Sequence, residues 1–176
     1  MAKRDPDIAR PIRCILSDVD GVLTDGQITL DNSGVESKNF YVRDGVAIKL
    51  WLRAGFSFGL VTARNSQIVK LRAAELGVAI VRQGSSDKLA TCREILSEHS
   101  LAPEEVCYIG DDLPDLPALN AMGLSVAVAD AADEVLAAAT WKTKKPGGRG
   151  AVRELIERLM QAKGCWSYSL HNDSAG

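Results

Sequence analysis

Acidic residues follow two apolar segments of the chain. Asp18 comes directly after the apolar run 12–17, and Asp111 comes two residues after the run 106–109. The acidic residues near these two ends are Asp18, Asp20, Asp111, Asp112 and Asp115. Carboxylates brought to one place repel each other and lose hydration, and a hard cation such as Mg²⁺ with its oxygen ligands relieves both costs. The spacing therefore predicts a magnesium site, although Asp112 also suits a helix cap beside Pro114.

A hydroxyl and an ammonium group complete this set. Thr62 ends a second strand-like run, residues 56–61, and Lys88 opens a helical segment after a third run, residues 78–81. Either residue alone would be unremarkable, as a turn hydroxyl or as a solvated lysine. Together with a metal and several carboxylates, they suit the oxygens of a phosphoryl group. A carboxylate can itself attack phosphorus and form an aspartyl-phosphate, so the set favours phosphoryl transfer.

The elements that must position these residues alternate along the chain. Strands are expected at 12–17, 56–61, 78–81, 106–109, 124–128 and 140–143, and helices at 45–54, 66–76, 87–99, 114–122, 130–139 and 151–162. Short, almost fully apolar strands separated by helices indicate a parallel sheet that is covered on both faces. The expected fold class is α/β, a doubly wound Rossmann-like sheet, and such sheets bind ligands beyond the carboxyl ends of their strands.

One segment departs from this alternation. Residues 27–42 carry two runs of partial period-2 patterning around Asn32, Ser33 and Gly34, which predicts a β-hairpin insertion at about 26–42. An isolated two-stranded hairpin is marginal in water, and its edges invite pairing with other strands. Hairpins from several subunits could therefore join, and a loose surface loop is the alternative.

Composition limits the remaining choices. The chain has 176 residues with 21 Lys and Arg against 23 Asp and Glu, so its formal net charge of −2 gives no general reason to bind nucleic acid or an anionic membrane. No apolar run approaches the ~20 residues of a membrane span. The charged residues 1–10 do not resemble a secretory signal. We expect a cytoplasmic protein with one domain at 11–163 and flexible tails at 1–10 and 164–176.

The motifs resemble those of a known superfamily. The run from Asp18 to Thr24 (DVDGVLT) resembles the first motif of the haloacid dehalogenase-like (HAD) phosphatases, and the run from Gly110 to Asp115 (GDDLPD) resembles the fourth. Thr62 and Lys88 match the second and third motifs. The resemblance implies that Asp18 is the nucleophile and Asp20 the general acid and base. It implies that Asp18, the carbonyl of Asp20 and Asp111 bind Mg²⁺, with Asp112 and Asp115 in outer positions. Thr62, Lys88 and Asp20 would contact the phosphoryl group or substrate.

Many HAD phosphatases carry a cap domain, for which this chain has no room. Only 41 residues separate Asp20 from Thr62, and only 25 separate Thr62 from Lys88. Further segments, among them residues 40–45 (FYVRDG) and 146–154 (PGGRGAVRE), resemble the capless subfamily that contains 3-deoxy-D-manno-octulosonate 8-phosphate (KDO 8-phosphate) phosphatase. This resemblance implies homotetramers assembled through the hairpins, a sugar-acid phosphate as substrate and a place in lipopolysaccharide biosynthesis.

Several assignments stay open at this stage. Arg64 at the mouth of the site suits a substrate or inter-subunit contact and fits the KDO 8-phosphate branch. A nine-carbon sugar acid phosphate is the alternative substrate. A phospho-acceptor receiver domain is a rival from another class, but Asp20 favours turnover over a stable phosphate, and a receiver places its paired acids earlier in the chain. Arg72 could face a neighbouring site. The Gly147–Gly150 segment with Arg149 suits either an anion cradle or a flexible turn.

Overall fold

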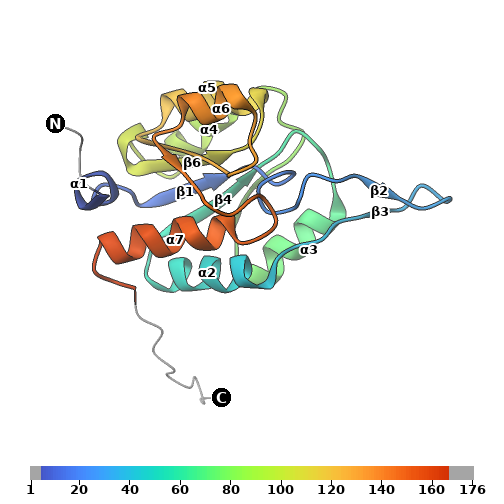
Figure 1. Ribbon diagram of the computed structural model, residues 1–176, viewed down its shortest axis with the longest axis horizontal. Coiled ribbons are helices and arrows are strands. Elements are labelled where there is room, and N and C mark those ends of the chain that lie inside the picture. The colour runs from blue at the N-terminus through green and yellow to red at the C-terminus, as the bar shows by residue number, and fades with distance from the viewer. Residues whose placement is uncertain (1–4, 167–176) are drawn as a thin grey trace, which may run out of the picture.

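The protein is built around one parallel sheet. The computed structural model describes residues 5–166, and its six-stranded sheet has the order β5-β4-β1-β6-β7-β8 with every pair parallel. The strands are β1 (Cys14–Ser17), β4 (Ser57–Val61), β5 (Ile80–Arg82), β6 (Val106–Gly110), β7 (Leu124–Ala127) and β8 (Trp141–Lys142). This is the doubly wound α/β sheet that the sequence predicts, and β1 lies between β4 and β6 near its centre (Figure 1).

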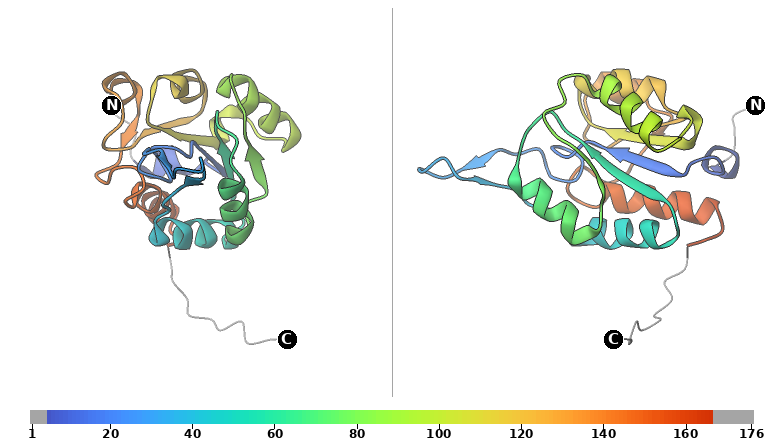
Figure 2. Two further views of the ribbon diagram at one scale, coloured as in Figure 1. Left: turned by 90° about the vertical axis from the view of Figure 1, so that its right-hand side faces the viewer. Right: turned by 180° about the vertical axis from the view of Figure 1, so that it is seen from behind.

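Helices cover both faces of the sheet. On one face lie α2 (Val42–Arg53), α3 (Gln67–Leu76) and α7 (Ala151–Ala162), and on the other lie α4 (Lys88–Glu98), α5 (Leu116–Ala121) and α6 (Asp133–Ala138) (Figures 1 and 2). Two short 3₁₀ turns, η1 (Pro103–Glu105) and η2 (Leu113–Asp115), stand on either side of β6. The helix expected at 114–122 is thus η2 followed by α5, because Pro114 and Pro117 break the backbone hydrogen-bond ladder there.

Burial explains why the strands read as continuous apolar runs. All four residues of β1 and all five of β6 are buried, since helices pack against both of their faces. Cys14 and Cys107 lie in this core as free thiols, as their apolar surroundings in the sequence predict. No folded cap domain stands over the sheet in the described part of the chain. Within the same residues, no helix has the length and apolar character needed to cross a membrane.

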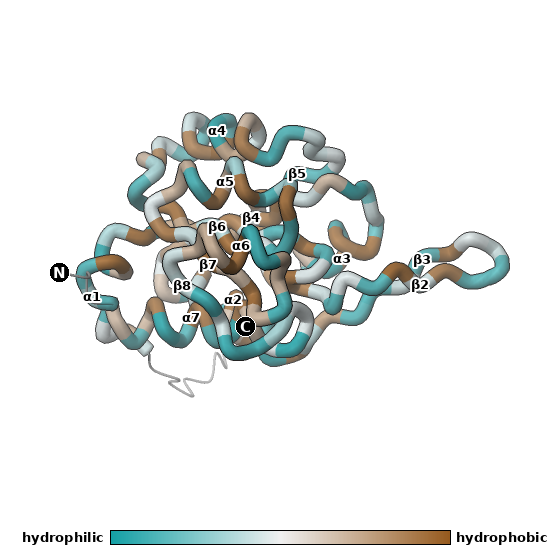
Figure 3. Tube along the Cα trace, turned by 45° about the horizontal axis from the view of Figure 1, so that its top comes forward, coloured by the Kyte–Doolittle hydropathy of each residue, from teal (hydrophilic) through white to brown (hydrophobic). Residues whose placement is uncertain are grey.

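The predicted hairpin is present and projects from the body. Its strands, β2 (Thr29–Leu30) and β3 (Glu36–Ser37), pair only with each other, and they extend beyond the end of the sheet (Figures 1 and 2). Asp31 closes the turn, where its carboxylate accepts hydrogen bonds from the backbone N–H groups of Ser33 (2.8 Å) and Val35 (2.9 Å). The hairpin includes hydrophobic positions, seen as brown stretches along β2 and β3 in Figure 3. The side chains of Ile28, Leu30 and Val35 are each about three-fifths exposed.

The N-terminal segment corrects one expectation. Residues 1–10 were expected to form a flexible tail, but Asp5–Ala9 form the helix α1, which packs against α7. Asp5 accepts two hydrogen bonds from the Arg158 guanidinium (2.6 and 2.8 Å), and Ala9 is fully buried. Because the segment is polar, its sequence does not indicate that it packs against α7. The expected C-terminal tail lies outside the described residues from position 167 onward.

Candidate active site

Three carboxylates meet at the carboxyl edge of the sheet. Asp18 directly follows β1, Asp111 directly follows the neighbouring strand β6, and Asp115 ends η2. One oxygen from each of these side chains lies within 4.8 Å of the others. Asp18 and Asp111 are therefore close enough to share an ion, because adjacent parallel strands end at the same level.

A buried lysine pairs with two of these carboxylates. Lys88 opens α4, and its Nζ atom lies 3.0 Å from Asp18 Oδ2 and 2.6 Å from Asp115 Oδ1. The Lys88 side chain is only 6% exposed, so solvent screens these contacts little. The Lys88 ammonium group therefore lies beside Asp18, at the edge of the sheet where the sequence predicts it.

Asp115 is more deeply embedded than an outer ligand would be. Its side chain is fully buried and accepts hydrogen bonds from the Tyr108 hydroxyl (2.8 Å) and from the backbone N–H groups of Asp111 (3.0 Å) and Asp112 (3.2 Å). It therefore fixes the loop that presents Asp111. Asp112 is exposed and accepts a hydrogen bond from the N–H of Leu113, the capping role that Pro114 suggested. Tyr108 was not identified from the sequence, since it reads as one more strand residue.

The charges at this edge are unbalanced. Burial and the nearby Asp115 raise the pKa of Asp18 to about 6, against the opposing effect of Lys88. Burial and the neighbouring Asp18 and Asp115 raise the pKa of Asp111 to about 8. For Lys88, burial favours the neutral amine, but Asp18 and Asp115 outweigh it and raise the pKa. One ammonium group thus faces three carboxylates, and a further cation would relieve the excess of negative charge.

The geometry around Asp111 fits a divalent metal. Asp111 Oδ1 is buried and has no hydrogen-bond partner among the described residues. The donors in the cluster are all carboxylate oxygens, the ligand type that Mg²⁺ prefers. Gly21 leaves room for this carboxylate, because a Cβ atom at Gly21 would lie 2.0 Å from Asp111 Oδ2. Asp18 and Asp111, with Asp115 beside them, therefore have the chemistry of a Mg²⁺ site.

Asp20 is not one of the three grouped carboxylates. Its carboxylate pairs with Lys38, which follows the hairpin strand β3. Lys38 also lies 3.3 Å from Glu36, and Glu36 pairs with Arg64 at 2.8 Å. We call Asp20, Glu36, Lys38 and Arg64 the hairpin-stem network. It ties the base of the hairpin to the loop after β1 and to the loop after β4, and its Lys38 side chain is only 2% exposed.

Thr62 lies at the same edge of the sheet as Asp18. It follows β4, which pairs with β1, and its side chain is buried. The Thr62 hydroxyl oxygen accepts a hydrogen bond from the Arg64 N–H (3.3 Å). The structure thus brings Asp18, Thr62, Lys88 and Asp111 to one edge, while the side chains of Asp20 and Arg64 join the hairpin-stem network.

The glycine-rich segment before α7 packs against the first motif. The Gly148 N–H donates to the Val22 carbonyl (2.9 Å), and a Cβ atom at Gly147 would lie 1.7 Å from the Gly21 carbonyl oxygen. This part of the segment is therefore a close packing contact and not a free turn. Arg72 also has a local role, since it pairs with Glu75 at 2.7 Å and lies over the Phe40 ring.

Asp44 is a buried carboxylate that the sequence pattern does not single out. It lies in the first turn of α2 but accepts a hydrogen bond from the Arg153 N–H (2.7 Å), in the first turn of α7. The N-cap residue of α7 is Gly150, which has no side chain for this purpose. Burial raises the pKa of Asp44 to about 6, and the Arg153 N–H offsets part of that effect. Asp44 thus joins two helices by capping the second from the first.

The fold and this edge define the class of the protein. A sequence model of the haloacid dehalogenase-like hydrolases matches residues 70–155. The KDO 8-phosphate phosphatase of Escherichia coli K12 is 44% identical over 156 residues, which cover 89% of this chain and 83% of the relative. The chain therefore belongs to the KDO 8-phosphate phosphatase family of haloacid dehalogenase-like hydrolases.

Solved structures agree with this assignment. The KDO 8-phosphate phosphatase of Yersinia pestis superposes with a TM-score of 0.91 at 41% identity, covering 94% of this chain and 89% of the other. The enzyme of Moraxella catarrhalis, in complex with a magnesium ion, a phosphate ion and KDO, gives a TM-score of 0.88 at 37% identity, covering 90% and 91%. The predicted capless α/β fold is thereby confirmed.

Proposed function

We propose that this protein is a Mg²⁺-dependent phosphomonoesterase that hydrolyses KDO 8-phosphate to KDO and phosphate through an aspartyl-phosphate on Asp18. The observation that carries the proposal is the Asp18 carboxylate at the carboxyl edge, 3.0 Å from Lys88 and grouped with Asp111. The relatives support the choice of substrate, and the Moraxella catarrhalis enzyme binds magnesium, phosphate and KDO.

In the first step, an oxygen of Asp18 attacks phosphorus, and the bond from phosphorus to the sugar oxygen breaks. Asp20 donates its proton to that leaving oxygen. In the second step, Asp20 takes a proton from water, the water oxygen attacks phosphorus, and the bond to Asp18 breaks. Phosphate leaves, and both aspartates return to their starting states. Through both steps Thr62 and Lys88 hold phosphoryl oxygens by hydrogen bonding and charge.

Asp18, the backbone carbonyl of Asp20 and Asp111 would hold Mg²⁺, with Asp112 and Asp115 in outer positions. When bound, the ion supplies positive charge that offsets the charge of the phosphoryl oxygens. Asp115 supports this arrangement through its hydrogen bonds to the Asp111 loop and through its pairing with Lys88. The same contacts keep Lys88 protonated and directed at Asp18.

Arg64 is the proposed contact to the sugar acid. Its side chain is 45% exposed and is held at the edge by Glu36. A guanidinium group there suits the carboxylate that a sugar acid carries in addition to its phosphate. Asp20 would also touch the substrate, through the leaving oxygen.

Assembly would complete the site of a chain without a cap. We infer a homotetramer joined through the hairpins, because three apolar side chains of the hairpin are exposed in the single chain. Residues 11–163 would form the catalytic domain, with the hairpin as an insertion at about 26–42. The proposed place of action is the cytoplasm, in lipopolysaccharide biosynthesis.

The deciding experiment is a substrate panel. Purified protein with Mg²⁺ is given 8-phosphates and 9-phosphates of 2-keto-3-deoxy sugar acids, and phosphate release is followed. The highest kcat/KM is expected for KDO 8-phosphate, and EDTA should abolish turnover. Preference for the nine-carbon substrate would overturn the proposed substrate alone. Full activity without divalent metal would overturn the mechanism.

A further inference from the structure

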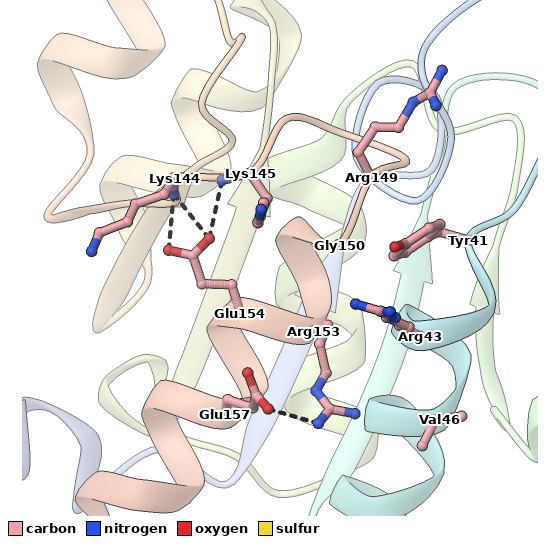
Figure 4. A pocket seen from close by; sticks show the side chains of 10 residues that line it. All are labelled: Tyr41, Arg43, Val46, Lys144, Lys145, Arg149, Gly150, Arg153, Glu154 and Glu157. Carbon is pink, nitrogen blue, oxygen red and sulfur yellow. Dashed lines mark hydrogen bonds and ion pairs between the residues drawn. The ribbon is translucent and has the colours of Figure 1, made fainter.

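A cavity lies between the N-termini of α2 and α7, on the face of the sheet that these helices cover. It has a volume of about 670 Å³ and is lined by the first turn of α2, by residues 144, 145, 149 and 150, and by the first turns of α7 (Figure 4). None of the acidic cluster residues lines it. We call this cavity the basic pocket, because five of its lining residues are cationic: Arg43, Lys144, Lys145, Arg149 and Arg153.

The two acidic residues of the basic pocket are already engaged. Glu154 accepts hydrogen bonds from the backbone N–H groups of Lys144 (2.9 and 3.0 Å) and Lys145 (3.0 Å), and Glu157 pairs with Arg153 at 2.6 Å. Figure 4 shows both carboxylates turned to these partners. They neutralise part of the positive charge and hold the loop and Arg153 in place.

Four cationic side chains are left without an ion-pair partner. Within residues 5–166, no carboxylate lies in salt-bridge distance of Arg43, Lys144, Lys145 or Arg149. The chain as a whole is slightly acidic, with a net charge of −2, so this concentration is a local feature. Cations gathered around one concavity repel each other and attract an anion.

The backbone adds to the same field. The helices α2 and α7 have 12 residues each, and neither receives a hydrogen bond from the side chain of its own N-cap residue, Tyr41 or Gly150. The positive ends of both helix dipoles therefore lie at the pocket. Asp44 beneath them offsets part of this charge, since it accepts the Arg153 N–H at 2.7 Å.

From these observations we propose that the basic pocket binds a small polyanion with two or more phosphate groups. The volume suits a small ligand, within the usual range of about 300–1,000 Å³. Arginine forks and lysine ammonium groups are the side chains that recognise phosphate oxygens. Four unpaired cations call for more than one anionic group, which separates this ligand from a single phosphate monoanion. The site is distinct from the carboxylate edge and does not depend on Mg²⁺.

The test uses inorganic pyrophosphate as the probe and the full chain in EDTA, so that the acidic cluster carries no metal. Isothermal titration calorimetry at low ionic strength should show one saturable site. The double variant Arg43→Gln/Arg149→Gln should weaken binding about tenfold or more, as loss of two charged contacts predicts. The matched control, Lys70→Gln/Arg93→Gln, removes two cations outside the pocket and should leave the affinity unchanged.

A second measurement needs no variant. Pyrophosphate should protect Lys144 and Lys145 from acetylation, read by mass spectrometry, while the exposed Lys70 should react at the same rate with and without it. Unchanged affinity in the pocket variant, or equal acetylation of Lys144 and Lys145, would overturn the proposal. Tighter binding of a single-stranded oligonucleotide through the same arginines would overturn the small-ligand class.

Discussion

The carboxyl edge of the sheet and the hairpin are held in place by different means. Asp18 and Asp111 follow β1 and β6, whose residues are all buried in the core. The hairpin strands have two residues each, and the apolar side chains in and beside them, Ile28, Leu30 and Val35, are exposed. The first region is specified within one chain. The hairpin is joined to the body through the hairpin-stem network, and we propose that other copies of the chain cover its apolar side chains.

The largest effect is expected at the sheet edge. Asp18→Asn removes the attacking oxygen anion and should lower phosphate release by on the order of 10⁴-fold. Light-scattering mass and circular dichroism should not change, because the strands that position residue 18 remain. Asp112→Asn, at an exposed neighbouring carboxylate, is the control and should lower activity far less. Substantial turnover by Asp18→Asn would remove Asp18 from the role of nucleophile.

The next prediction concerns the hairpin. Replacing Ile28, Leu30 and Val35 together by serine should convert the proposed tetramer to monomers in multi-angle light scattering. Each buried aliphatic side chain contributes about 1.5–3 kcal/mol, so the three together weaken association by a factor of about a thousand or more. Leu71→Ser, at an exposed apolar residue of α3, should leave the mass unchanged. A wild-type protein that is already monomeric at micromolar concentration would show that the hairpins do not join copies of the chain.

The hairpin-stem network joins the two regions, and Lys38 tests that link. Lys38→Met removes a charged contact to Asp20, and such contacts contribute about 1.5–3 kcal/mol, so kcat should fall about 10- to 100-fold. Decay of the phosphoenzyme should slow, because Asp20 must be positioned to take the proton from water. Lys38→Arg should restore part of the rate, and Lys49→Met on α2 is the control. Equal phosphoenzyme decay in wild type and Lys38→Met would show that the pair has no part in catalysis.

The smallest effect is expected where the hairpin segment rejoins the body, at Asp44. Its pKa in the folded protein, about 6, lies above its usual value of 3.8. Stability from this group is therefore present at low pH and is lost as pH rises through about 6. This contribution is about 1–3 kcal/mol for a shift of this size.

The matched variant isolates that contribution from the other buried acids. Asp44→Asn keeps an oxygen for the Arg153 N–H but cannot ionise. The difference in unfolding free energy between variant and wild type should grow in favour of the variant between pH 4 and pH 7, measured by urea denaturation. Asp133→Asn, at an exposed carboxylate on α6, should give a curve parallel to that of wild type. A constant difference across this range would mean that Asp44 ionises freely in the folded protein.

The predictions from sequence succeeded where local pattern and topology agree. Parallel strands covered on both faces must be apolar throughout, so β1, β4 and β6 are visible as runs, and residues after such strands must share one edge. That reasoning brings Asp18, Thr62 and Asp111 together before any coordinates are known. The same reasoning predicts the position of Lys88, because this residue opens the helix that follows β5.

The residues that escaped prediction act across long sequence distances. Lys38 reads as an exposed hairpin lysine and becomes buried only where the hairpin stem folds back on Asp20. Asp44 reads as an acidic first-turn residue of its own helix, whereas it caps α7, 109 positions away. Residues 5–9 look like a polar tail, but the bidentate pair of Asp5 with Arg158 and the burial of Ala9 dock them against the body. In each case the deciding contact is tertiary and leaves no periodic signal.

The contact between Gly147–Gly148 and the loop at Gly21 has a further consequence. All four motifs are complete by Asp115, yet the segment that buttresses the first of them comes more than thirty positions later in the chain. A polypeptide ending after β7 would possess every reactive group and still lack the support that shapes the turn beside Asp18. During synthesis, the chain must therefore emerge as far as Gly148 before the loop beside Asp18 can reach its final conformation.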